Sequence, residues 1–163
     1  MIIRQYTQSD CKEITELFYD TIHTVNINDY TDEQINAWAD GKPDLEKWNK
    51  SLSENYTLVA VNKEIIVGFG DIDDSGYLDR LYVHKDYQRQ GIASAICDKL
   101  EKKFNVPEIT VHASVTAKIF FEKRGYKTIK IQQVERHNIQ ISNYIMKMIC
   151  IPVSELKFLN SKK

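Results

Sequence analysis

The chain has 163 residues, of which 42% are hydrophobic and 28% are charged, and its formal net charge is -1. A chain of this length can bury about 70% of the surface that its unfolded form exposes, so one core can be stable without disulfides or a structural metal. A charge balance this close to zero argues against a protein dedicated to binding nucleic acid or anionic membranes, because both partners favour a basic excess.

The even balance conceals an asymmetry along the chain. Residues 1–80 contain 7 Lys/Arg and 16 Asp/Glu, whereas residues 81–163 contain 15 Lys/Arg and 7 Asp/Glu. We therefore expect the two halves to face ligands of different charge.

Three cysteines, Cys11, Cys97 and Cys150, are far apart in the sequence. They form neither a CxxC pair nor a Cys/His cluster at metal-ligand spacing, so we predict a reducing compartment and no bound metal. The first residues turn polar within a few positions, unlike a signal peptide, and no apolar run is long enough to span a bilayer. The sequence therefore predicts a cytoplasmic protein with no membrane partner.

The predicted elements begin with a short strand over residues 2–6. The sequence at 7–10 (Thr-Gln-Ser-Asp) has the pattern of a capping box, and apolar residues follow it at helical spacing. A second box at 31–34 and an aspartate at position 44 predict two more helices before residue 56. Both tryptophans, Trp38 and Trp48, fall on these helices, where their spacing favours packing in the core.

Three consecutive strands are predicted next. Residues 56–61 and 64–70 are rich in β-branched and aromatic side chains, and the polar pair at 62–63 predicts the turn of a hairpin. A turn at 73–76 then leads into a third strand over 77–84.

The second half of the chain alternates helices and strands. We predict an amphipathic helix within 88–104, a strand over 108–112, a helix capped by Ser114, and two strands at 126–134 and 139–148 joined near His137-Asn138. Antiparallel hairpins with one strand-helix-strand crossover predict an α+β fold in which helices cover a sheet. No repeat or linker is present, so we predict a single domain over 1–150 and a C-terminal tail over 151–163.

The most informative stretch is Gln88-Arg-Gln-Gly-Ile-Ala93, which leads from a strand into a helix. Gly91 stands where the backbone must turn tightly or approach a ligand closely. Unpaired N–H groups at such a helix start, aided by the helix dipole, can bind a phosphate-sized anion. The alternative is a glycine that only permits the turn. The spacing matches neither a nucleotide P-loop nor a GxGxxG motif.

This stretch also resembles the signature of a known family. Gln88-x-x-Gly91-x-Ala93 matches the Q/R-x-x-G-x-G/A motif of the GNAT superfamily of acetyl-CoA-dependent N-acetyltransferases, and it follows a strand that contains Leu81-x-Val83. Residues 117–126 (Ala-Lys-Ile-Phe-Phe-Glu-Lys-Arg-Gly-Tyr) resemble the family's A-x-x-F-Y-E-K-x-G-F helix and strand. The resemblance covers residues 56–148 and implies a mixed, mostly antiparallel sheet of six to seven strands with helices on both faces.

The resemblance further implies where acetyl-CoA, the cosubstrate, would bind. The backbone at 81–83 would pair with the pantetheine arm like an added strand, and the N–H groups at 88–93 would hold the pyrophosphate, with Arg89 adding charge. Ser114 would line the far wall of the cofactor channel, although capping a helix is its alternative role, and Phe120 can equally be core. The implied cofactor-binding residues are Leu81, Tyr82, Val83, Gln88, Arg89, Gln90, Gly91, Ile92, Ala93, Ser114, Ala117, Phe120 and Phe121.

The chemistry of such a site is the attack of an amine on a thioester. An alkyl ammonium with a pKa of about 10 must first lose a proton, which requires a base or a chain of waters. Asp79, on the strand before the cofactor loop, is the first candidate for this base, and a salt bridge with Arg80 is its structural alternative. Asp71, Asp73 and His23 are weaker candidates.

The sequence departs from the family pattern at the position of the residue that acts as the general acid. Where the FYEK motif places a tyrosine, this chain has Phe121, which cannot donate a proton to the leaving thiolate. Tyr144 on the last strand and His112 at the end of an earlier strand are the candidate replacements, and each has a packing role as its alternative. A thiol with a pKa of about 8.5 can also leave unaided.

We therefore predict an N-acetyltransferase that acts on a primary amine of a small molecule or peptide. A non-catalytic CoA-binding or sensory module of the same fold is the alternative, whereas a DNA-binding regulator is disfavoured because the chain has no helix-turn-helix signal. Aromatic and acidic residues between 21 and 55 would suit an amine cation, and the predicted acceptor-binding residues are His23, Tyr30 and Trp38. We expect a monomer or a homodimer.

Overall fold

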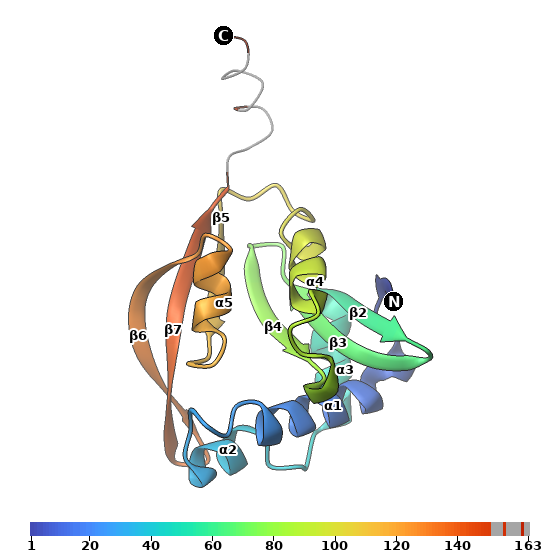
Figure 1. Ribbon diagram of the computed structural model, residues 1–163, viewed down its shortest axis with the longest axis vertical. Coiled ribbons are helices and arrows are strands. Elements are labelled where there is room, and N and C mark those ends of the chain that lie inside the picture. Colours follow the sequence, from blue (N-terminus) through green and yellow to red (C-terminus); the bar gives the residue numbers. More distant parts are fainter. Residues whose placement is uncertain (151–154, 156–160, 162–163) are drawn as a thin grey trace.

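The computed structural model describes residues 1–150 together with residues 155 and 161, so most of the predicted tail at 151–163 lies outside the described residues. Helices and strands follow one another in the predicted order (Figure 1). The strands are β1 (Ile2–Gln5), β2 (Tyr56–Asn62), β3 (Ile65–Ile72), β4 (Tyr77–Val83), β5 (Glu108–Ala113), β6 (Lys127–Arg136) and β7 (Ile139–Ile149). The helices are α1 (Cys11–Thr24), α2 (Asp32–Trp38), α3 (Leu45–Glu54), α4 (Ile92–Leu100) and α5 (Lys118–Lys123), with 3-10 turns at Gln8–Asp10 and Lys85–Tyr87.

All seven strands form one sheet in the order β1-β2-β3-β4-β5-β7-β6. Neighbouring strands are antiparallel except β4 and β5, which are parallel because the chain returns through α4 between them. The structure thus confirms the predicted α+β fold and its mixed, mostly antiparallel sheet. Among the described residues, no helix has both the length and the apolar character needed to cross a membrane.

Alternate residues of β2 pack on opposite faces of this sheet. Leu58 and Ala60 belong to a buried cluster with Ile96 of α4, whereas Val59 belongs to a second cluster with Ile14 of α1 and with α3. Figure 1 shows α4 and α5 in front of the sheet and α3 behind it. Helices therefore cover both faces, which explains why β2 reads as an almost continuous apolar run.

Both predicted capping boxes are present. The Asp10 carboxylate accepts a hydrogen bond from the backbone N–H of Thr7 at 2.8 Å, and the Gln34 side chain accepts one from the backbone N–H of Thr31 at 2.9 Å. Each box satisfies backbone donors that a helix start leaves unpaired.

Two glycines of β3 let α4 lie close to the sheet. A Cβ atom on Gly70 would be 3.0 Å from the carbonyl oxygen of Arg80 and 3.0 Å from Ile96, and one on Gly68 would be 3.0 Å from Ile92. Larger side chains at these positions would push the helix away. The glycines therefore hold the first turn of α4, and the loop before it, against β3 and β4.

The two hairpin turns were predicted with different accuracy. His137 and Asn138 join β6 and β7 with φ values of 50° and 63°, the left-handed backbone that a two-residue turn requires, as predicted. The turn between β2 and β3 lies at Lys63 and Glu64, with φ values of 49° and 67°, so the predicted position was wrong by one residue. The difference arises because Asn62 still pairs across the hairpin.

The parallel pairing of β4 with β5 is short. Only Tyr77 with Thr110 and Leu78 with Val111 are in register, although β4 continues as far as Val83. Beyond Leu78, the edge of β4 that faces β5 therefore has no strand partner within the part of the chain that the structure describes. This unpaired edge lies at the centre of the sheet, where the candidate site is found.

Candidate active site

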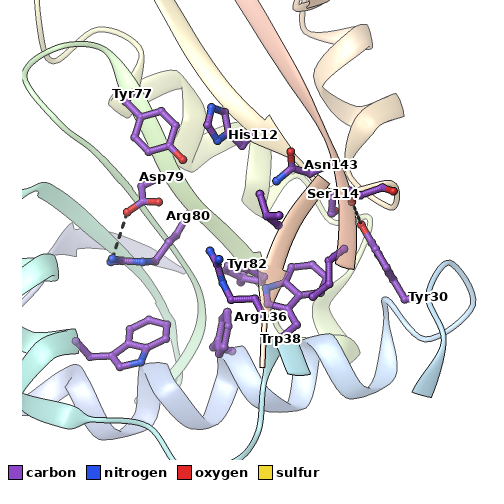
Figure 2. Close-up of a pocket in the computed structure, with 15 residues that line it drawn as sticks. Tyr30, Trp38, Tyr77, Asp79, Arg80, Tyr82, His112, Ser114, Arg136 and Asn143 are labelled. Carbon is purple, nitrogen blue, oxygen red and sulfur yellow. Dashed lines mark hydrogen bonds and ion pairs between the residues drawn. The ribbon is translucent and has the colours of Figure 1, made fainter. Parts of the chain in front are cut away.

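A cavity of about 290 Å³ lies where β4 and β5 separate, and its wall also includes residues of β6, β7 and helices α1 to α3 (Figure 2). Aromatic rings make up much of this wall: Phe18, Tyr30, Trp38, Trp48, Tyr77 and Tyr82. The polar residues in it are Asp79, Arg80, His112, Ser114, Arg136, Ser142 and Asn143. We call this space the acceptor cavity.

A β-bulge places Asp79 in the wall of the acceptor cavity. Asp71 of β3 pairs with Arg80, and the next residue, Ile72, pairs with Leu78, so Asp79 is the extra residue on β4. A bulge of this kind redirects a side chain away from the regular alternation of the strand. Asp79 and Arg80 can therefore both line the same cavity although they are consecutive.

Arg80 joins two carboxylates. Its guanidinium lies 2.8 Å from Oδ2 of the buried Asp71 and 3.2 Å from Oδ2 of Asp79, whose side chain is 32% exposed. The same guanidinium donates to the hydroxyl of Ser51 and lies over the ring of Trp48, 5.1 Å from its centroid. The charge of Arg80 is thus satisfied within the protein, and the ion pair restricts the orientation of Asp79.

Asp71 is fully buried behind the cavity wall. Burial raises the pKa of its carboxyl to about 6, and the positive charge of Arg80 opposes this increase. Asn55 also donates a hydrogen bond to Asp71, at 3.0 Å. Above pH 6 the carboxyl is mostly ionised, so at neutral pH it holds Arg80 as an ion pair.

His112 reaches the cavity from β5. Its ring meets the ring of Tyr77 edge-on, with 5.0 Å between the centroids, and Nδ1 lies 3.2 Å from Nε2 of Gln132. Burial lowers the pKa of His112 below its usual value, although the charge of Asp79 opposes the decrease. His112 is therefore mostly neutral at pH 7 and able to accept a proton.

Tyr30 links the cavity to the end of β5. Its hydroxyl accepts a hydrogen bond from the backbone N–H of Val115 at 2.8 Å and donates one to the carbonyl oxygen of Ser142 at 3.3 Å. Next to it, the hydroxyl of Ser114 accepts a hydrogen bond from the N–H of Ala117 at 3.0 Å. Ser114 therefore caps the turn before α5 and also lines the cavity.

The loop before α4 has a backbone suited to holding an anion. Arg89 and Gly91 have φ values of 60° and 80°, and Gly91 directly precedes the helix. A Cβ atom on Gly91 would meet no other atom within 4 Å, so the space beside the loop is open. The side chain of Gln88 donates to the carbonyl oxygen of Val83 and so ties the loop to β4. These residues fit the phosphate groups of a coenzyme.

Several predicted residues line the acceptor cavity: the candidate catalytic or acceptor-binding residues Asp79, His112, Tyr30 and Trp38, and two predicted cofactor-binding residues, Tyr82 and Ser114. Tyr30 and Trp38 are in contact there, with their rings edge-to-face and their centroids 5.3 Å apart. Residues from α2, from the loop before it, and from two strands thus meet at one place, and their roles in binding the acceptor and in proton transfer stay predictions.

Two other predicted residues lie elsewhere. The ring of His23, on α1, stacks on Tyr19, and its Nε2 lies 2.7 Å from the carbonyl oxygen of Ala39. Tyr144, on β7, packs beside Lys118, whose Nζ is 5.1 Å from the centre of its ring. Neither is part of the cavity wall, so the geometry lends no support to their predicted roles in binding the acceptor and in proton transfer.

Phe121, which stands at the family's tyrosine position, is a core residue. It is 2% exposed and meets the rings of Phe120 and Tyr126 edge-on, with 5.1 Å between centroids in each case. Packing explains an apolar ring at this position. Its place in the wall of the cofactor channel, like that of Ala117, stays a prediction.

Sequence reasoning missed Arg136 and Asn143, which line the cavity from β6 and β7. The predicted strand ended at residue 134, whereas β6 continues to Arg136, which shares a face with Val134 because alternate residues of a strand do so. The sequence could not show that this face lies over the cavity, because the position of β6 in the sheet depends on long-range pairing.

Comparisons with known proteins agree with this geometry. Residues 26–148 match the acetyltransferase (GNAT) domain. Over 145 residues the chain is 34% identical to the uncharacterized N-acetyltransferase YafP of Escherichia coli, and the match covers 89% of this chain and 93% of that protein.

Solved structures agree as well. A GCN5-related N-acetyltransferase from Rhodopseudomonas palustris has a TM-score of 0.88 at 31% identity, covering 91% of this chain and 95% of that one. The PaiA N-acetyltransferase of Thermoplasma acidophilum, in complex with coenzyme A, has a TM-score of 0.72 at 20% identity, covering 91% and 98%, and so shares the fold. The chain therefore belongs to the GNAT family of N-acetyltransferases.

Proposed function

We propose that this N-acetyltransferase transfers the acetyl group of acetyl-CoA to a primary amine by direct attack of the amine on the thioester. The observation that carries the proposal is the position of Asp79, which a bulge places in the cavity wall where β4 and β5 separate. A proton acceptor at this point lies on the same strand as the unpaired edge to which the pantetheine arm would bind.

The unpaired edge of β4 and the loop before α4 fit acetyl-CoA. The backbone of Leu81, Tyr82 and Val83 would pair with the pantetheine arm as an added strand. The N–H groups at 88–93 would hold the pyrophosphate, because the left-handed backbone at Gly91 leaves open space beside them. The exposed Arg89 would add a positive charge next to the phosphates.

Asp79 would accept the proton of the acceptor ammonium, directly or through a water molecule. A positioned proton acceptor is worth about 10²- to 10⁴-fold in rate. His112, neutral at pH 7, would assist by passing the proton on. A backbone N–H of β4 near Val83 would stabilise the negative charge that develops on the carbonyl oxygen, because a donor fixed before the reaction costs no reorganisation.

Departure of the thiolate needs no side-chain acid in this proposal. Phe121 has no proton to give, and the neutral His112 is a poor donor. A thiol with a pKa of about 8.5 is an adequate leaving group without protonation. Tyr144 stays the alternative acid, although it packs beside Lys118 outside the cavity wall.

The test is turnover of acetyl-CoA with a panel of polyamines, amino acids, aminoglycosides and peptides. Release of free thiol gives the rate, and mass spectrometry identifies the acetylated amine. We expect at least one amine to be acetylated with a stoichiometry of one thiol per product. Thiol release without an acetylated amine would be hydrolysis and would contradict the proposal.

The lack of a proton donor at the family's tyrosine position, where this chain has Phe121, favours a second candidate, a non-catalytic module that binds CoA as a signal. This candidate predicts tight binding of CoA in calorimetry and no acetylated product with any amine. Catalysis predicts both binding and product, so the two measurements together separate the candidates.

A further inference from the structure

The wall of the acceptor cavity contains an exposed cation, Arg136, that has no ion-pair partner among the described residues. It lies at the end of β6, and its guanidinium donates only to the carbonyl oxygen of Glu135 within this part of the chain, at 3.0 Å. Figure 2 shows Arg136 among the side chains that surround the cavity. Arg80, by contrast, is shared by two carboxylates, Asp71 and Asp79, so these three residues together carry one net negative charge when both carboxyls are ionised.

Arg136 also lines a second cavity, of about 240 Å³, together with Phe18, Trp38 and Trp48. These four residues are common to both cavities, so Arg136 stands at the boundary between them. A ligand that extends from Asp79 to this boundary would pass flat aromatic rings and meet the guanidinium of Arg136. The wall of the second cavity also contains Asp40, Lys42 and Asp44, so a carboxylate on the ligand would bind at the boundary, where Arg136 lies. The volumes suit a small molecule rather than a large antibiotic or a folded substrate.

At another point in the wall, the amide oxygen of Asn143 is buried and accepts no hydrogen bond from the described residues. A buried acceptor without a donor is costly, and a ligand N–H would satisfy it. The cavity wall therefore offers acceptors, Asn143 and Asp79, for the amine end of a ligand, and a donor, Arg136, for an anionic end.

We infer that the acceptor is a small amine that also carries a carboxylate, with Arg136 binding the carboxylate and Asp79 and Asn143 facing the amine. A guanidinium binds a carboxylate through two parallel hydrogen bonds, which gives both affinity and orientation. A polyamine without an anionic group would instead bring its charges next to an unpaired guanidinium. This inference rests on the proposed function and revises the expectation that the pocket suits a simple cation.

The test uses pairs of amines that differ only in a carboxylate: tyrosine with tyramine, tryptophan with tryptamine, and γ-aminobutyrate with propylamine. We expect kcat/KM to be higher for the carboxylate-bearing member of at least one pair. Arg136→Gln should lower kcat/KM for that member by about 10- to 100-fold, the loss expected for a hydrogen bond to a charged group, and should leave its partner nearly unchanged. Arg136→Lys should restore part of the preference.

Lys127→Gln is the matched control, because Lys127 is an exposed cation on the same strand outside both cavities. It should leave the preference for the carboxylate intact.

Calorimetric binding of the same pairs in the presence of CoA gives a readout that does not require turnover. Equal binding and equal rates with and without the carboxylate, or a preference that survives Arg136→Gln, would overturn the inference while the acetyltransferase proposal stands. A carboxylate preference in binding that Arg136→Gln removes, with no acetyl transfer, would support the inference and overturn the proposed activity.

Discussion

Asp79 and Asp71 share the guanidinium of Arg80, yet they differ in exposure and therefore in what they can do. Asp71 is fully buried and can only anchor Arg80, whereas the side chain of Asp79 is 32% exposed and lies in the cavity wall. The anchored Arg80 fixes the direction of the Asp79 carboxylate. These differences are the reason that we propose Asp79 for proton transfer and the other two residues for positioning.

Asp79→Asn should lower kcat by about 10²- to 10⁴-fold, because the amide cannot accept the amine proton. The dissociation constant for acetyl-CoA should not change, since the loop at 88–93 that we propose for phosphate binding is untouched. Steady-state kinetics and calorimetry measure the two quantities. Asp74→Asn is the control, because Asp74 is exposed and lies outside the acceptor cavity. An unchanged kcat at saturating substrate would remove Asp79 as the base.

Asp71 should make stability depend on pH in an unusual direction. Its pKa is raised in the folded protein to about 6, above the unfolded value, so the native state holds a proton that the unfolded state has lost. The contribution of this carboxyl to stability is therefore full below pH 4 and is lost as the pH rises through about 6, with a magnitude of about 2–3 kcal/mol.

Urea denaturation of the wild type and of Asp71→Asn across this pH range checks that prediction. The asparagine variant cannot ionise, so the free energy of unfolding of the wild type should fall relative to the variant between pH 4 and pH 6. A constant difference between the two proteins would show that Asp71 keeps its ordinary pKa in the fold.

Single residues were predictable where a local motif identified them. Asp79 could be identified as a candidate because its strand leads to the loop at 88–93. Gly91 could be identified from the spacing of the residues around it. Arg136 and Asn143 belong to no motif, and they reach the cavity only because β7 pairs with β5 and β6 pairs with β7. Such long-range pairing leaves no trace in the residues around an individual arginine or asparagine.

At the scale of elements, the loop before α4 depends on the left-handed backbone of Gly91. Gly91→Ala meets no steric obstacle, so its cost is the conformational strain of about 1 kcal/mol. The added methyl group would, however, occupy the open space beside the N–H groups that we propose hold the phosphates. We expect the affinity for CoA to fall at least tenfold in calorimetry.

Gly125→Ala is a matched control for this change. Gly125 has a φ value of 99°, and a Cβ atom there would also meet nothing within 4 Å, but it lies after α5 and outside the loop at 88–93. Both variants should lose similar stability in urea denaturation, and only Gly91→Ala should lose affinity for CoA. An equal loss of affinity in both would mean that strain, and not the loop, determines binding.

Periodic elements were the most predictable part of the fold. Capping boxes and apolar periodicity identified the helices and strands in their order, because each signal is local. The bulge at Asp79 was not predictable, since it is a mismatch between two strands: Asp71 opposes Arg80, and Ile72 opposes Leu78. The same reason explains the one-residue difference in the turn between β2 and β3.

At the scale of the whole molecule, the basic second half of the chain is only partly available to a ligand. Arg124 is held by Glu101, with 2.6 Å between the charged atoms, and Lys118 by Glu122 at 2.7 Å. Exposed cations in or near the two family motifs that form no ion pair with a described residue include Lys85, Arg89, Lys99 and Lys123. The charge asymmetry of the sequence thus overstates the charge that can attract CoA.

The acidic first half also contributes less to the acceptor site than its composition predicts. The acidic side chain in the cavity wall is Asp79, which shares Arg80 with Asp71, and Arg136 from the second half is a cation there without an ion-pair partner among the described residues. Folding brings the two halves together in one cavity. The expectation that each half of the chain faces a ligand of a different charge is therefore too simple, because both halves line the same cavity.

The remaining exposed cations should make CoA binding dependent on salt. Raising the ionic strength from about 0.05 M to about 0.5 M shortens the screening length several-fold, so the dissociation constant for CoA should rise several-fold. Arg89→Gln should weaken binding at low salt and reduce this dependence, because one of the screened contacts is gone. Lys47→Gln, which removes an exposed cation on α3, should change neither quantity. Calorimetry at several salt concentrations separates these cases, and an affinity independent of salt would mean that backbone N–H groups alone hold the phosphates.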